Sequence, residues 1–140
     1  MGEHTFRASG CLLAVVLLAG CGGPIQRDQL KHRVKTLASD AADGSLLARG
    51  VAEGRTRSTF VRAHGRELSD DVDHQAEELH DTHADPPLAA KKQQAVAIAE
   101  SISSALGQLH VAPGDRQPAR TAERQLDALA KRANDLADSL

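Results

Sequence analysis

The chain has 140 residues, with 17 Lys and Arg against 19 Asp and Glu, and a formal net charge of −2. It contains two Phe but no Trp and no Tyr. This composition argues against nucleic-acid binding, which needs clustered cations and aromatic rings that stack on bases. The shortage of aromatic rings also argues against carbohydrate platforms and aromatic cages for cations. The core must be built from Ala, Leu, Val and Ile, which suits closely packed helices better than a sheet.

The first segment has the parts of an export signal. A head that carries Arg7 is followed by an eight-residue apolar run, Leu12 to Ala19, and then by small residues. A transmembrane helix needs roughly 20 apolar residues, so this run is too short to be one. The residues Leu18-Ala19-Gly20-Cys21 resemble the lipobox of bacterial lipoproteins. That resemblance implies cleavage before Cys21 and attachment of lipid to its sulfur. The alternative is an ordinary signal peptide cut elsewhere, but all three residues before Cys21 match the lipobox.

The lipobox divides the chain into three parts. We expect a signal peptide at residues 1–20, a lipid-anchored short tether at 21–24 and a helical bundle domain at 25–140. The resemblance implies attachment to the cell membrane or, in a Gram-negative cell, to the outer membrane, because Gly22 rather than Asp follows the cysteine. The bundle then faces the periplasm or the cell exterior. Acylation of Cys21 leaves no free thiol in the mature chain, which excludes disulfides and cysteine-based redox or zinc chemistry.

Apolar residues recur at helical spacing after the tether. The first seam comprises Leu30, Val34, Leu37 and Ala41. Asp43-Gly44-Ser45 predicts a turn or an interruption after it. A second seam follows with a period of about 3.5 residues, which is typical of helices packed nearly parallel. Its members are Leu47, Val51, Val61, Gly65, Leu68, Val72, Gln75 or Ala76, and Leu79. Two alternatives stay open for this span: one helix longer than its partners, or a helix broken near Gly54.

Two further helices complete the expected fold. Asp85-Pro86-Pro87 predicts a helix start, with Asp85 as N-cap and Pro86 at the first helical position. The seam of this helix comprises Leu88, Ala95, Ile98, Ile102, Ala105 and Leu109. Pro113-Gly114-Asp115 predicts the next break, and a last helix begins at about Arg116. Its seam comprises Leu126, Leu129, Ala133, Leu136 and Leu140. Four seams joined by turn residues predict an all-α, up-and-down four-helix bundle.

Acids and histidines gather in the second of these helices. Asp73, Glu77 and His80 are separated by four and three positions, so they share one helix face, and His83 lies one turn further along. Glu77 and His80 form the Glu-x-x-His pattern that di-metal carboxylate bundles place on their helices. Carboxylate oxygens and imidazole nitrogens suit Zn, Mn or Fe. These four residues are therefore candidate ligands for a divalent metal. The alternative is a solvated charged face with ion pairs three and four positions apart, which is the usual case for a bundle helix.

The same region carries a second, distant resemblance. Residues 45–48, 60–68 and 71–74, followed by Leu79, look like secreted ferritin-like helical families of unknown function. The Met of that family pattern is missing, and Asp73-His74 stands further from Phe60 than the pattern has it. The resemblance implies a helical bundle and transfers no metal role.

No nucleophile and base can be paired from the sequence, so it assigns no catalytic residue and no cofactor. The leading interpretation is a non-enzymatic, lipid-anchored envelope lipoprotein whose bundle binds a partner protein or envelope component. The alternative is a metal-binding, ferritin-like bundle that uses Asp73, Glu77, His80 and His83. A third class, carriage of an apolar ligand, needs an interior pocket between the helices.

Overall fold

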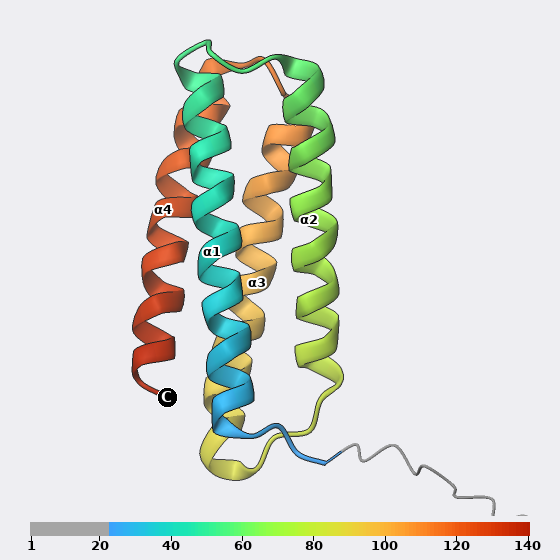
Figure 1. Cartoon of the computed structure of the whole chain (residues 1–140), viewed down its shortest axis with the longest axis vertical. Coiled ribbons are helices and arrows are strands. Elements are labelled where there is room, and N and C mark those ends of the chain that lie inside the picture. The colour runs from blue at the N-terminus through green and yellow to red at the C-terminus, as the bar shows by residue number, and fades with distance from the viewer. Residues whose placement is uncertain (1–22) are drawn as a thin grey trace, which may run out of the picture.

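Four antiparallel helices make up the part of the chain that the structure, a computed structural model, describes, residues 23–140 (Figure 1). They are α1 (Arg27–Ala52), α2 (Ser58–Asp81), α3 (Pro86–Val111) and α4 (Arg116–Asp138). These residues contain no strand. The all-α, up-and-down four-helix bundle expected from the seams is confirmed. The expected signal peptide and Cys21 lie outside the described residues.

The four seams meet along the axis of the bundle. The predicted seam residues of α1, from Leu30 to Ala41, are all fully buried. Ile102, Leu109 and Leu126 are equally buried, while Leu88 packs against the core from a partly buried position. Full burial of a Leu or Ile side chain contributes about 1.5–3 kcal/mol. The small Ala side chains between these residues let the helices approach closely, most extensively α1 on α4 and α2 on α3.

The turn expected at Asp43-Gly44-Ser45 is wrong, because α1 continues through these residues to Ala52. Gly44 is buried against α3 and α4, where a Cβ would lie 2.6 Å from Cδ2 of Leu106. Ser45 is also buried, and its hydroxyl donates a hydrogen bond at 2.5 Å to Asp127 of α4. The residues that predicted a turn instead lie where α1 packs closely against α3 and α4.

The true break between the first two helices lies at Gly54. Of the two open alternatives, the helix broken near Gly54 is confirmed and the single long helix is wrong. Gly54 has a φ of +72°, a left-handed conformation that glycine adopts without the steric cost of a Cβ. The guanidinium of Arg116 lies over this glycine, since a Cβ there would be 2.7 Å from Nη2 of Arg116. Leu47 and Val51 therefore belong to α1 rather than to α2.

The expected starts of the last two helices are confirmed. Asp85 is the extended residue before Pro86 of α3, and Asp115 holds the same position before α4. The Asp115 carboxylate accepts a hydrogen bond from the Gln117 backbone N–H at 3.1 Å. That bond satisfies one of the unpaired N–H groups of the first helical turn.

The segment before α1 is held to the opposite end of the bundle from Gly54. Ile25 is buried, and its backbone N–H donates to the His83 carbonyl in the α2–α3 loop at 2.8 Å. The end of α4 lies at this same end of the bundle (Figure 1). None of the helices in residues 23–140 has an apolar stretch long enough to cross a bilayer.

Candidate functional site

The four predicted metal ligands do not form one group. Asp73, Glu77 and His80 are exposed on α2 and line a shallow surface hollow together with Glu100 of α3. His83 lies beyond the end of α2 and lines a different hollow. The structure therefore brings three of the candidates to one face and leaves the fourth apart.

Neighbouring side chains on this face pair with each other. His80 Nδ1 lies 3.2 Å from a carboxylate oxygen of Asp81, and His74 Nε2 lies 3.3 Å from Glu78. Arg33 of α1 donates a hydrogen bond to Glu78 at 2.5 Å, and this bond and the guanidinium charge lower the pKa of Glu78. Across residues 23–140, no three His, Cys, Asp or Glu side chains lie close enough together to hold a metal ion. Metal binding at this face stays a prediction from the sequence.

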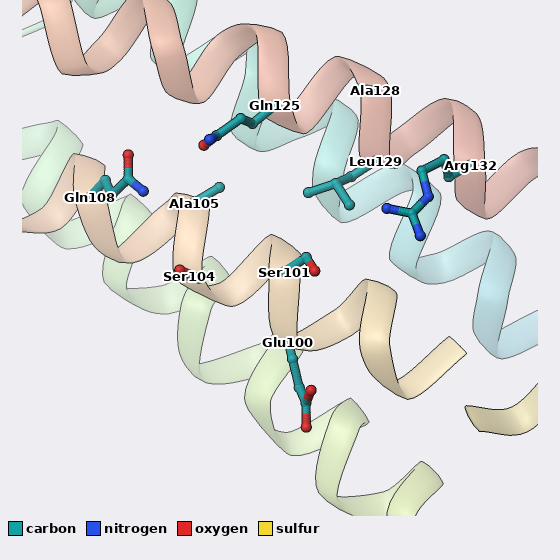
Figure 2. A pocket seen from close by; sticks show the side chains of 9 residues that line it. All are labelled: Glu100, Ser101, Ser104, Ala105, Gln108, Gln125, Ala128, Leu129 and Arg132. Atoms are coloured by element: carbon teal, nitrogen blue, oxygen red, sulfur yellow. The ribbon is translucent and has the colours of Figure 1, made fainter. Parts of the chain in front are cut away.

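A groove of about 510 Å³ lies between α3 and α4 (Figure 2). Ala105 and Leu129 form its apolar part, and Arg132 extends into it from α4. The other lining residues are Glu100, Ser101, Ser104, Gln108, Gln125 and Ala128. The groove is open to solvent and is not the interior pocket that carriage of an apolar ligand needs.

The polar lining of the groove consists of amides, hydroxyls, one carboxylate and one guanidinium. The Ser101 hydroxyl donates to the Ala97 carbonyl of its own helix at 2.7 Å. No His lines this groove, so its serines have no imidazole beside them to act as base. Such a lining is suited to hydrogen bonding with another polar surface.

Two polar links join α1 to its neighbouring helices, one at the surface and one partly buried. Arg49 donates to Glu123 of α4 at 2.8 Å, and this hydrogen bond raises the pKa of Arg49. Asp40 accepts a hydrogen bond from Gln75 Nε2 of α2 at 2.7 Å. Burial raises the pKa of Asp40, the bond from Gln75 opposes that rise, and the negative charge of Asp71 adds to it. The Gln75 side-chain oxygen is buried without a hydrogen-bond partner among the described residues. The appearance of Gln75 at an apolar seam position was the sequence signal for this link.

The end of the bundle farthest from Ile25 carries features that the sequence reasoning missed. We call this end the distal cap, which comprises residues 53–62 and 108–120. Its two segments are joined across the bundle, since His110 Nδ1 lies 3.2 Å from the Arg62 carbonyl oxygen. Phe60 is 56% exposed and Val111 is 82% exposed, and they are two of the three large apolar side chains exposed among residues 23–140. Phe60 is the sole aromatic residue outside the first 20 positions, and this was the signal available in the sequence.

Comparison of the chain with protein-family models, with curated proteins and with solved structures finds no match in any of the three.

Proposed function

We propose that the chain is a lipid-anchored envelope lipoprotein whose helical bundle binds a partner protein or envelope component and catalyses no reaction. The observation that carries the proposal is Leu18-Ala19-Gly20-Cys21 at the end of a short apolar run. Each CH₂ of an acyl chain buried in the bilayer contributes about 0.8 kcal/mol, so a cysteine with two or more chains holds a protein on the membrane for long times.

The short tether supports a defined orientation of the bundle. Ile25 follows Cys21 by four positions and is already part of the packed fold. Four extended residues span at most about 14 Å, so a lipid on Cys21 keeps the α2–α3 end of the bundle beside the bilayer. The distal cap is then the part that points away from the membrane.

A binding role also fits the surface chemistry. The α3–α4 groove is open and lined by amides, hydroxyls, one carboxylate and one guanidinium, together with the apolar Ala105, Ala128 and Leu129. The metal-binding alternative has weaker support, because its candidate ligands Asp73, Glu77 and His80 are exposed and His83 lies apart from them.

The lipid anchor is tested by substitution of Cys21 in the full chain. We expect Cys21→Ala to leave an unprocessed precursor or a soluble product, and to lose metabolic labelling by a palmitate analogue. Cys11→Ala is the matched control, because Cys11 lies in the segment expected to be removed. This control variant should mature and label like the parent chain. Normal maturation and membrane retention of Cys21→Ala would refute lipidation at this site.

A further inference from the structure

The distal cap combines exposed apolar side chains with an excess of positive charge. Phe60 and Val111 supply the apolar surface. The cap holds five arginines and two acids, although the chain as a whole has a net charge of −2. Its arginines are Arg55, Arg57, Arg62, Arg116 and Arg120. No Lys occurs in either segment of the cap.

Both acids of the cap are already engaged. Glu53 pairs with Arg55, and Asp115 accepts the backbone N–H of Gln117 at the start of α4. Within residues 23–140, the other four cap arginines take part in no ion pair. The positive charge of the cap is therefore available to a ligand.

The rest of the bundle surface differs in sign. Residues 67–81 of α2 contain seven Asp and Glu and neither Lys nor Arg. This charge distribution would direct an acidic partner toward the cap and away from α2. Complementary electrostatic potentials guide two proteins together and disfavour wrong orientations.

The residue types of the cap are those that carry binding free energy at protein interfaces. Aromatic residues and Arg are enriched in interface cores, and Lys is depleted there. A guanidinium also binds a carboxylate through two parallel hydrogen bonds, which the ammonium of Lys cannot do. A cap that combines an exposed Phe with four arginines outside any ion pair among the described residues thus matches a protein surface that presents carboxylates beside an apolar side chain.

We propose that the distal cap is the partner-binding surface of this bundle, and that its partner is an acidic segment of another envelope protein. This inference rests on the proposed function, because the anchor sets which end is free. The 26 residues of α1 are about 39 Å long at 1.5 Å per residue. The cap therefore stands well above the anchoring bilayer, out of reach of its anionic lipid headgroups.

The experiment is photo-crosslinking with the full lipidated chain in its own envelope. Benzoylphenylalanine replaces Phe60 in the cap or, as the matched control, Leu46 on α1, which is 60% exposed. We expect position 60 to crosslink a protein whose crosslinked peptide, identified by mass spectrometry, is rich in Asp and Glu. Position 46 should give no such product.

A charge reversal tests the role of the arginines. The double variant Arg57→Glu/Arg62→Glu should reduce the crosslink from position 60 by about tenfold or more, as expected for loss of central interface arginines. Lys35→Glu/Lys131→Glu makes the same charge change at two exposed lysines outside the cap and the α3–α4 groove, and should leave the yield unchanged. Circular dichroism of each purified variant checks that the helices are intact.

Several outcomes would overturn the inference. One such outcome is no crosslink at position 60, or equal crosslinking at position 46. Another is a product with lipid, glycan or a second copy of this chain alone. A third is a yield that responds to the Lys35/Lys131 control rather than to the cap variant. These results leave the anchor untouched. Failure of the anchor is seen separately, as normal maturation and membrane retention of Cys21→Ala.

Discussion

Replacement of Gly44 by Ala tests the closest helix contact in the bundle. A Cβ at this position would lie 2.6 Å from Cδ2 of Leu106 and 3.2 Å from Cδ1 of Leu126. Both leucines are fully buried in the core, so the added methyl group must displace packed side chains. Overpacking of this kind costs about 1–3 kcal/mol, while the change from Gly to Ala in a helix interior contributes about 1 kcal/mol of stability. We expect Gly44→Ala to lower the free energy of unfolding by about 1 kcal/mol.

Gly107 provides the matched control for the same chemical change. It lies within α3, and a Cβ there would meet no atom within 4 Å. The helix propensity of Ala then acts without opposition, so Gly107→Ala should raise the free energy of unfolding by about 1 kcal/mol. The two variants should therefore differ by about 2 kcal/mol, although each adds one methyl group to a helix.

Urea unfolding of a soluble chain covering residues 22–140, followed by far-UV circular dichroism, measures this difference. A shift in the midpoint at constant slope reports a change in stability alone. If Gly44→Ala proved as stable as Gly107→Ala, α1 would not approach α3 and α4 as closely as described. The interpretation of Gly44 as a packing residue would then be wrong.

Two further predictions concern pH. Burial raises the pKa of Asp40 above its usual value of about 3.8. The folded chain therefore holds a proton on the Asp40 carboxylate more tightly than the unfolded chain does. As a result, the contribution of Asp40 to the free energy of unfolding falls as the pH rises above that usual value. Asp40→Asn should remove this decline and raise the free energy of unfolding by about 1 kcal/mol near neutral pH, because an amide can also donate a hydrogen bond to the unpaired oxygen of Gln75. If the urea midpoint of the variant equalled that of the parent at every pH, this prediction would be contradicted. The pKa of Glu78 is lowered by Arg33, so its contribution is present above the unfolded value and is lost as pH falls through the lowered one. Glu78→Gln should therefore weaken the acid-side decline and its salt dependence, and an unchanged acid limb at low and high salt would count against this pair.

The sequence by itself determined the number of helices and most of the core. Apolar residues at helical spacing, such as Leu30 and Ile102, mark the buried face of each helix, because that spacing depends only on the geometry of the local backbone. The starts of α3 and α4 could also be predicted from neighbouring residues alone, since Asp followed by Pro or by a helix former defines an N-cap within a few residues. The predicted lipobox is local in the same sense and does not depend on the fold.

Tertiary structure decided what these local patterns could not. Gly44 and Gly54 look alike in the sequence, but one meets Leu106 and Leu126 across the bundle while the other ends α1 with a positive φ. The distal cap likewise exists because antiparallel packing brings residues 53–62 beside residues 108–120. Helical periodicity predicts which face of a helix is buried but not which neighbour covers it. The roles of these glycines and the grouping of the cap arginines therefore depend on how the helices pack.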